Sequence, residues 1–399
     1  MNDMNIPFTR PWLGVEEEAA AARVIHSGWV TQGPEVEAFE REFAEFVGAP
    51  CACAVSSCTA ALHLALMAAG VQSGDEVVTV SHSFIATANA VRYCGATPVF
   101  VDIDPGTYNL NPAMVERAIS SRTRAILCVH QMGMPCDLAA ILPLARKRGI
   151  LVVEDAACAT GSEILWNGQW EKIGKPHGDV ACFSFHPRKL LTTGDGGMIT
   201  TRRPEWDRQF KLWRHHGMDL PDSARHKAKQ ILFEGYAALG YNYRLTDIQA
   251  AVGREQLKRI PAVVERRRAM GERYLSQLAS IPGIGLPVEP AWAKTNWQSF
   301  CIRLPDGCRQ LDVMQRLLDA GVASRRGVMN AHEEPAYGPE DWSCGCLKPE
   351  CRCKPRSCAR LHESETAKTG CILLPMFHGM TEEQQDWVVK SLADSVRGR

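Results

Sequence analysis

Short apolar runs alternate with amphipathic stretches along the first half of the chain. The runs are rich in β-branched residues, which favours strands buried on both faces of a sheet. We predict strands at Glu76–Val80, Pro98–Ile103, Arg124–His130, Ile150–Glu154, Asp179–Ser184 and Gly197–Thr201. We predict helices between them at Thr59–Ala69, Ala86–Tyr93, Pro112–Ile119 and Leu138–Lys147. This alternation indicates an α/β fold with a mostly parallel sheet covered by helices.

The last two predicted strands break this pattern. Asp179–Ser184 and Gly197–Thr201 are joined by a connection too short to contain a crossover helix. Parallel neighbours need such a crossover, whereas antiparallel neighbours do not. We therefore expect one of these two strands to run antiparallel to its neighbours.

The second half of the chain has a different rhythm. Asp247–Leu278 is a long helical pattern, and Pro261 is expected to kink or break it. A strand at Gln298–Leu304, a helix at Leu311–Ala320 and an amphipathic helix at Glu382–Val396 follow. We predict a large domain at 1–260 and a small mixed domain at 261–399.

Charge and composition narrow the class of protein. The 399 residues contain 45 Lys and Arg and 45 Asp and Glu, so the formal net charge is zero. A balanced charge argues against bulk electrostatic binding of nucleic acid or of an anionic membrane. No run has the length of a membrane span, and the first residues lack the apolar core of a secretion signal. We therefore expect a cytoplasmic protein whose scattered cysteines are mostly reduced.

Asp155 follows the predicted strand Ile150–Glu154 directly. Ligands on parallel sheets gather at the carboxyl ends of strands, where a carboxylate could meet a cationic ring nitrogen. The alternative is a helix N-cap or an ordinary loop charge.

Ser184 and Lys189 lie where another predicted strand runs into a glycine-rich turn. A lysine that is partly removed from water loses its proton more easily and can attack a carbonyl. The alternative is a surface lysine beside a hairpin turn.

Two further features lie upstream. Ser57, Cys58 and Thr59 run straight into a predicted helix, whose first N–H groups could hold a phosphate. Phe84 could lie flat on an aromatic ligand. Ordinary helix capping and a core phenylalanine are the alternatives. One cofactor, pyridoxal 5′-phosphate (PLP), fits these features in their order along the chain: a phosphate cradle, an aromatic shelf, an acid, a serine and a lysine.

With these motifs the sequence resembles the DegT/StrS-type sugar aminotransferases, which are PLP enzymes of fold type I. The matching stretches are Gly28–Pro34 with Glu40, Ser57–Leu62, Glu154–Ala157, Ser184–Gly197, Gly240–Ala251, and Leu374–Phe377 followed by Met380–Glu383. They cover nearly the whole chain in the family's order. The resemblance implies a large domain with a seven-stranded type of sheet and a small α+β domain at the C-terminal end.

The resemblance also implies roles for single residues. Lys189 would carry PLP as a Schiff base and move protons, and Asp155 would pair with the pyridine nitrogen. The phosphate would be held by Ser184 and by residues Ser57, Cys58 and Thr59, and Phe84 would stack on the ring. Asn242 or Arg244 would reach the phosphate of a neighbouring subunit, which implies a homodimer with shared active sites. Thr31 and His332 are the candidates for substrate contacts.

Two positions depart from the family pattern. Cys58 stands where the family often has glycine, and Cys158 stands where it often has histidine or glutamine close to the 3-hydroxyl of the cofactor. A thiol is a weaker hydrogen-bonding group than either of those side chains. We therefore expect Cys158 to change the tuning of the cofactor or the choice of substrate.

A cluster of cysteines lies in a predicted loop at 342–362. Cys344, Cys346, Cys351 and Cys353 could bind a structural zinc ion, and Cys358 is close in sequence. The alternative is a loop of reduced thiols, because the spacing is not that of two C-x2-C pairs. We hypothesise that this loop forms a flap near the acceptor site.

Taken together, the sequence predicts a PLP-dependent aminotransferase. The expected reaction moves an amino group from glutamate or glutamine to a nucleotide-linked keto-sugar, in the biosynthesis of amino sugars, natural products or surface glycans. One alternative keeps the cofactor but acts on a cyclitol, or catalyses oxidation or dehydration. The retained Lys189 argues against relatives that lost it and became dehydratases. A second alternative is a non-catalytic regulatory or interaction protein on the same fold.

Overall fold

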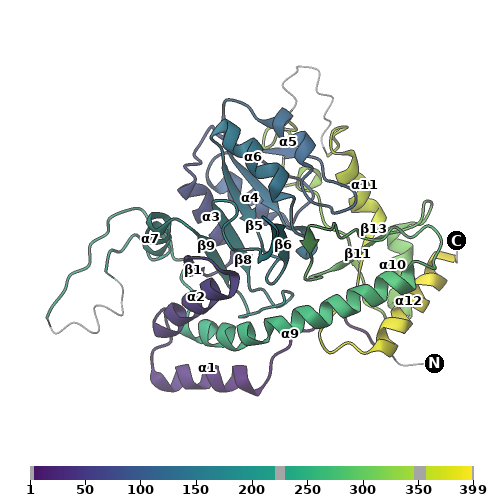
Figure 1. Cartoon of the computed structure of the whole chain (residues 1–399), viewed down its shortest axis with the longest axis horizontal. Coiled ribbons are helices and arrows are strands. Elements are labelled where there is room, and N and C mark those ends of the chain that lie inside the picture. The colour runs from purple at the N-terminus through teal and green to yellow at the C-terminus, as the bar shows by residue number, and fades with distance from the viewer. Residues whose placement is uncertain (1–3, 221–229, 346–355, 398–399) are drawn as a thin grey trace.

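A computed structural model describes residues 4–220, 230–345 and 356–397 (Figure 1). Its main sheet contains β1 (Cys51–Val55), β2 (Glu76–Val80), β3 (Thr97–Val101), β4 (Thr123–Val129), β5 (Leu151–Asp155), β8 (Val180–Ser184) and β9 (Gly197–Thr201). The strand order is β1-β9-β8-β5-β4-β2-β3. The chain therefore has the α/β architecture that the hydrophobic pattern predicts.

The direction of the strands also agrees with the sequence. β3, β2, β4, β5 and β8 pair in parallel, whereas β9 runs antiparallel to both β8 and β1. The antiparallel strand is thus Gly197–Thr201. The first strand, Cys51–Val55, was not predicted, because its alternating Cys and Ala residues carry only a weak hydrophobic pattern.

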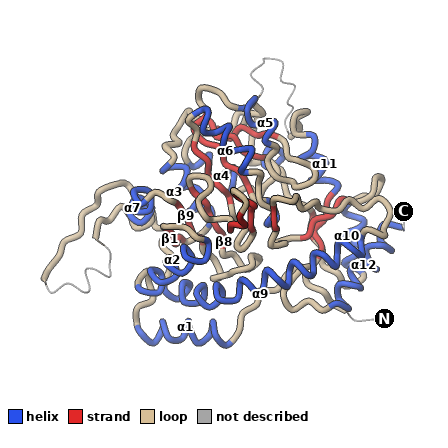
Figure 2. The backbone as a smooth tube through the Cα atoms, in the orientation of Figure 1, coloured by secondary structure: helices blue, strands red, loops and turns tan. Residues whose placement is uncertain are grey.

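Helices cover both faces of this sheet (Figure 2). α3 (Cys58–Ala68), α4 (Ala86–Tyr93) and α7 (Pro204–Trp213) supply apolar residues to the core on one face. α2 (Pro34–Val47), α5 (Pro112–Ala118) and α6 (Leu138–Arg148) supply them on the other. Neighbouring residues of β5 alternate between these faces, since Val152 joins one core and Val153 the other.

The long helix α9 (Asp247–Leu278) runs beneath the sheet, from α1 and α2 at one end toward α12 at the other (Figure 1). The prediction that Pro261 could break it is wrong, because the helix continues through this residue. Ile260 and Val263 pack into the core of the large sheet, so burial on both sides of Pro261 holds the helical path. Met270 and Tyr274 pack into a separate core. We propose that the domain boundary, predicted near 260, lies within this helix.

The C-terminal part contains a small antiparallel sheet of β11 (Phe300–Arg303), β13 (Cys371–Leu374) and β12 (Arg325–Arg326). Around it lie α10 (Gln310–Asp319), the short 3-10 turn η2 (Ala331–Glu333), α11 (His362–Gly370) and α12 (Glu382–Arg397). The remaining elements are α1 (Val15–Ser27), which packs on α9, the turn η1 (Gln131–Gly133), and the sheet of β10 (Ala293–Lys294), β6 (Glu163–Trp166) and β7 (Gln169–Lys172). No helix in the described parts of the chain is long and apolar enough to cross a membrane.

Candidate active site

The candidate site lies where β5 and β8 end. Asp155 is the last residue of β5 and Ser184 is the last residue of β8. The two strands are parallel neighbours, so their carboxyl ends meet at one edge of the sheet. Lys189 follows β8 closely enough to interact electrostatically with Asp155 and with Cys58 at the start of α3. The fold thus gathers an amine, a carboxylate and a helix start that are far apart in sequence.

Lys189 is half-buried, and its Nζ donates a hydrogen bond to Cys158 Sγ at 3.0 Å. Burial alone would lower the pKa of Lys189, but the interactions with Cys158, Cys58 and Asp155 outweigh it and raise this pKa above its ordinary value. This burial is at odds with the surface-lysine alternative, but the raised pKa contradicts the expectation that the lysine loses its proton more easily.

Asp155 is buried, and both of its carboxylate oxygens accept hydrogen bonds. Thr87 Oγ1 donates to Oδ2 at 2.8 Å, and the backbone N–H of Ala157 donates to Oδ1 at 3.1 Å. Burial raises the pKa of Asp155, while these two hydrogen bonds and the charge of Lys189 act in the opposite direction. The sequence interpretation missed Thr87. A usable signal was its position in the first turn of a predicted helix, four residues after Ser83, in the segment that follows the strand Glu76–Val80.

The start of α3 lies against β9 and β8. Ser57 caps this helix, because its side chain accepts a hydrogen bond from the N–H of Ala60 at 3.1 Å. Gly197 on β9 faces the same point: a Cβ atom there would lie 2.6 Å from the carbonyl carbon of Ser57 and 2.7 Å from the nitrogen of Cys58. Capping, the alternative reading of Ser57, therefore occurs, and it leaves Cys58 and Thr59 at an N-terminus suited to an anion.

These residues fit PLP on the chemistry of their groups. The amine of Lys189 suits the aldehyde of the cofactor, the carboxylate of Asp155 suits its ring nitrogen, and the start of α3 suits its phosphate. Gly197 lets β9 approach this helix start closely, because any larger side chain would overlap the backbone of Ser57 and Cys58.

Phe84 lies just before α4 and is 64% exposed. This exposure rules out the core alternative and leaves the ring available to a ligand, so stacking on the cofactor stays a prediction. Asn242 and Arg244 lie in the segment between α7 and α9, where Arg244 Nη1 donates to His215 Nδ1 at 2.8 Å. Their contact with a neighbouring subunit also stays a prediction.

Thr31 belongs to a turn that Asp247 holds in place. The N–H of Asp247 donates to the carbonyl oxygen of Thr31 at 3.1 Å. The carboxylate of Asp247 accepts from the N–H groups of Gly33 at 2.8 Å, Glu35 at 3.1 Å and Val36 at 3.0 Å, and so caps the start of α2. The nearby Gln249 donates to the carbonyl oxygen of Asp195 in the glycine-rich turn at 2.7 Å. The Thr31 turn and the Lys189 turn are therefore both tied to the first turn of α9.

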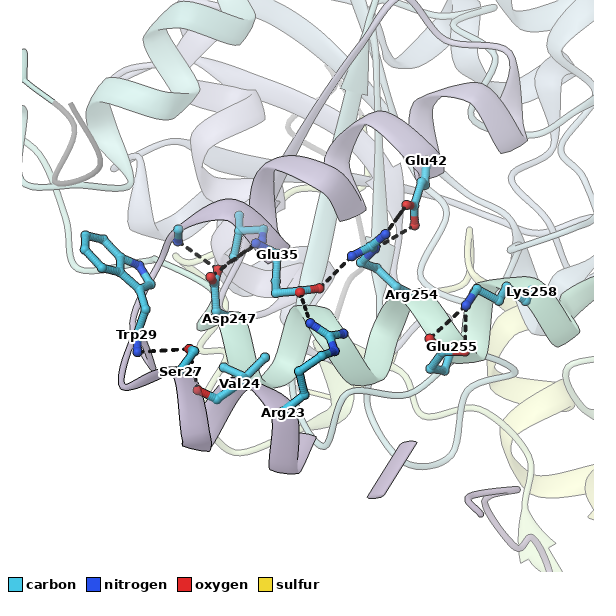
Figure 3. A network of polar contacts seen from close by, with 12 residues as sticks. Arg23, Val24, Ser27, Trp29, Glu35, Glu42, Asp247, Arg254, Glu255 and Lys258 are labelled. Carbon is cyan, nitrogen blue, oxygen red and sulfur yellow. Dashed lines mark hydrogen bonds and ion pairs between the residues drawn. The ribbon is translucent and has the colours of Figure 1, made fainter. Parts of the chain in front are cut away.

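Charged residues around Glu35 reinforce this arrangement (Figure 3). Glu35 pairs with Arg23 of α1 and with Arg254 of α9, and Arg254 also pairs with Glu42 of α2. Three helices are thus joined beside the Thr31 turn.

His332 lies in the interior of the described chain, with 0% of its surface exposed. Its Nδ1 lies 2.6 Å from Ser81 Oγ, and its Nε2 lies 3.2 Å from Glu365 Oε1. Because both ring nitrogens are engaged, a contact of His332 with substrate is an untested prediction that this arrangement does not favour.

The predicted zinc site falls mostly outside the described residues. Cys346, Cys351 and Cys353 are not described, and Cys344 is buried. Among the residues that are described, no group of three or more His, Cys, Asp or Glu side chains could hold a metal ion. Zinc binding at the cysteine loop therefore remains untested.

Comparisons with known proteins point to one family of enzymes. The model of the DegT/DnrJ/EryC1/StrS aminotransferase family matches residues 11–393. The spore coat polysaccharide biosynthesis protein SpsC of Bacillus subtilis (strain 168) is 33% identical over 397 residues, which cover 98% of this chain and 97% of SpsC.

Solved structures show the same relationship. DesV of S. venezuelae, determined with a ketimine intermediate, is 34% identical with a TM-score of 0.84, covering 99% of both chains. Spr1654, a candidate sugar aminotransferase of Streptococcus pneumoniae in its PLP form, is 25% identical with a TM-score of 0.87, covering 98% of this chain and 99% of Spr1654.

Proposed function

The chain belongs to the DegT/DnrJ/EryC1/StrS aminotransferase family and is a PLP-dependent aminotransferase, and from that premise we propose that it aminates a keto-sugar, with Lys189 as the covalent anchor of the cofactor. The observation that carries the role of Lys189 is its place beside Asp155 at one edge of the sheet. Membership in an aminotransferase family leaves no support for the non-catalytic alternative.

Each residue of the site has a separate role in the proposed reaction. Bound PLP supplies an electron sink that makes a proton on the nitrogen-bearing carbon of the substrate easier to remove. Lys189 holds the cofactor and then moves that proton as a general acid and base. Asp155 stabilises the positive charge of the ring nitrogen, since a buried carboxylate gains most from an adjacent cation. The N-terminus of α3 and Ser184 bind the phosphate.

We propose that glutamate or glutamine donates the amino group and that a nucleotide-linked keto-sugar accepts it. Support for the sugar comes from the names of the similar proteins, because SpsC is named for polysaccharide biosynthesis and Spr1654 is a candidate sugar aminotransferase. The pathway we propose is the making of an amino sugar for a glycan or a natural product.

We also propose that the active protein is a homodimer whose sites are shared between subunits. Residues 230–240, which precede Asn242 and Arg244, belong to the loop after α7 that stands away from the body of the molecule in Figure 1. Ile231, Phe233 and Leu239 in this segment are each at least 85% exposed. Apolar side chains exposed in this way favour a protein partner, and a second copy of this chain would bury them.

The proposed function is tested with purified protein and the variant Lys189→Ala. The wild type is expected to bind PLP with a visible absorbance, to lose that absorbance when glutamate or glutamine is added while a keto acid forms, and to regain it with a keto-sugar. Lys189→Ala is expected to lose turnover by at least about 10²–10⁴-fold, the usual contribution of a general acid–base group. The matched control is Lys147→Ala on an exposed face of α6.

Each outcome has one meaning. Full transamination by Lys189→Ala would overturn the role of this lysine. Loss of absorbance with an amino donor but no recovery with any keto-sugar would leave the aminotransferase in place and overturn the sugar substrate.

A further inference from the structure

The carboxylate of Asp155 is held by a side chain that lies outside every motif of the site. Thr87, in the first turn of α4, donates from Oγ1 to Asp155 Oδ2 at 2.8 Å. Thr87 itself is 2% exposed, so water does not compete for this contact. The backbone N–H of Ala157 occupies the other oxygen, Oδ1. One donor on each oxygen fixes the plane of the carboxylate and therefore the direction in which it faces a ligand.

The direction of the hydrogen bonds can be deduced from the number of protons. An ionised carboxylate only accepts, so the single hydroxyl proton of Thr87 must point to Asp155. Ser83 Oγ lies 2.8 Å from Thr87 Oγ1, and this second contact must then use the proton of Ser83. The order is Ser83 to Thr87 to Asp155. Hydroxyl groups in such a chain polarise one another, so Ser83 strengthens the bond that Thr87 makes.

The loop that carries Ser83 is held by the C-terminal part of the chain. The N–H of His332 donates to Ser81 Oγ at 3.1 Å, and His332 Nδ1 lies 2.6 Å from the same oxygen. Since the carboxylate of Glu365 only accepts, Nε2 carries the proton of the neutral ring and donates to it, and Nδ1 then accepts from the hydroxyl of Ser81. Asn330 accepts from the next residue, His82, through its Oδ1 at 2.9 Å.

These contacts explain why His332 is buried. Together they hold the carbonyl and the hydroxyl of Ser81 and the imidazole of His82, the two residues directly before Ser83. Thr87 is held from its own side too, because its N–H donates to the carbonyl oxygen of Phe84 at 3.1 Å. A β-branched threonine with a stiff χ1 angle keeps its hydroxyl on target better than a flexible side chain would.

We propose that Thr87 is a positioning residue of this enzyme, which keeps the carboxylate of Asp155 oriented and ionised toward the ring nitrogen of PLP, with Ser83 as its support. The proposal rests on the proposed role of Asp155 and adds a residue that does not touch the cofactor. Without the proton from Thr87, the buried carboxylate more readily takes a proton of its own. It then loses its attraction for a protonated ring nitrogen.

The test compares three variants. Thr87→Val keeps the shape of the side chain and removes the hydroxyl, and Thr87→Ser restores the hydroxyl. Thr79→Val is the matched control, because Thr79 is equally buried on β2 and donates to the carbonyl oxygen of Leu127 instead of to Asp155. The apoprotein of each is loaded with PLP labelled with ¹⁵N in the ring. The nitrogen NMR signal then reports directly whether the ring nitrogen carries a proton.

Thr87→Val is expected to move the ¹⁵N signal toward that of an unprotonated pyridine and to weaken PLP binding by about 10-fold, the usual effect of one hydrogen bond to a charged group. Thr87→Ser is expected to restore both the ¹⁵N signal and the affinity for PLP. Thr79→Val is expected to leave the ¹⁵N signal unchanged and the affinity within about 3-fold of the wild type. A wild-type ¹⁵N signal in Thr87→Val, or no recovery in Thr87→Ser, would overturn the proposal.

Ser83→Ala covers the case in which Thr87→Val does not fold. It leaves Thr87 in place and is expected to shift the ¹⁵N signal in the same direction by a smaller amount, and an unchanged signal would contradict the chain of donors. A wild type that binds no PLP would overturn the proposed function itself, whereas a functional wild type with unaffected variants would overturn only the role of Thr87.

Discussion

Lys189 Nζ donates a hydrogen bond to Cys158 Sγ at 3.0 Å, although the two residues are 31 positions apart. Cys158 follows β5 and Lys189 follows β8, and these strands are parallel neighbours. The thiol therefore contacts the amine that must lose a proton before it can attack the aldehyde of PLP. Where the family often has histidine or glutamine, this chain has a group that acts on the protonation of the lysine itself.

Replacing Cys158 with alanine is expected to shift the pH dependence of PLP capture to lower pH. Burial lowers the pKa of Lys189 and Cys158 is the largest of the interactions that raise it, ahead of Cys58 and Asp155. Without Cys158 this pKa falls, so the neutral amine becomes available at lower pH. The rate at which the apoprotein captures PLP, followed by absorbance over a pH series, measures the shift. Cys308→Ala, remote from the site, is the control, and coincident curves for Cys158→Ala and the wild type would contradict this role.

Gly197→Ala is expected to weaken PLP binding without unfolding the protein. The added Cβ would lie 2.6 Å from the backbone of Ser57, so the start of α3 must move away from β9. Forced shifts of this kind cost about 1–3 kcal/mol, or roughly 10- to 100-fold in affinity if the phosphate cradle bears them. Titration of the apoprotein with PLP measures the change. Gly370→Ala, where nothing lies within 4 Å of the new Cβ, should bind PLP like the wild type.

A mixture of two inactive variants is expected to recover activity if the sites are shared. Lys189→Ala and Arg244→Ala, unfolded and refolded together, form mixed dimers in which one site holds both defects and the other holds neither. Random association of a symmetric dimer then restores about a quarter of the wild-type activity. The measurement is the specific activity of the mixture against that of each variant alone. An activity equal to the mean of the two variants would mean that each site is complete within one subunit.

His378 is expected to make the N-terminal segment sensitive to mildly acidic pH. Its ring stacks on Trp12 at 3.8 Å, and Arg259 covers Trp12 at 4.7 Å. Burial, together with Arg266, Arg267 and Arg259, lowers the pKa of His378. A histidine with a lowered folded pKa stabilises the fold above its unfolded pKa of about 6.5 and loses that contribution as the pH falls from this value through the lowered folded pKa.

Hydrogen exchange of the amides around Trp12, corrected for the intrinsic effect of pH, should therefore rise as the pH falls below about 6.5. His378→Phe keeps an aromatic ring in the stack and removes the titration, so its exchange should not depend on pH in this way. His26→Phe, on an exposed face of α1, is the control and should behave like the wild type. Equal pH dependence in His378→Phe would assign the effect to another group.

Much of the fold could be predicted from the sequence because the information is local. The strand Gly197–Thr201 and the helix Ala86–Tyr93 have the predicted bounds, since hydrophobic runs and their flanking residues mark such elements. Pro261 is the exception. Its missing N–H is a local signal for a break, but burial of the apolar residues on both sides of it outweighs that signal.

The candidate site divides in the same way. The sequence by itself determined the kinds of group present, because Lys189, Asp155 and the start of α3 each lie in a short motif with its own chemistry. Tertiary structure alone decided their neighbours: Cys158 at the amine of Lys189, Thr87 at the carboxylate of Asp155, and Ser81 at the ring of His332. These contacts join residues 31, 68 and 251 positions apart, and their existence depends on the order of the strands and on the packing of the C-terminal part against them. A short run of residues does not specify the order of the strands. The sequence therefore identifies the reacting groups but not the side chains that contact them.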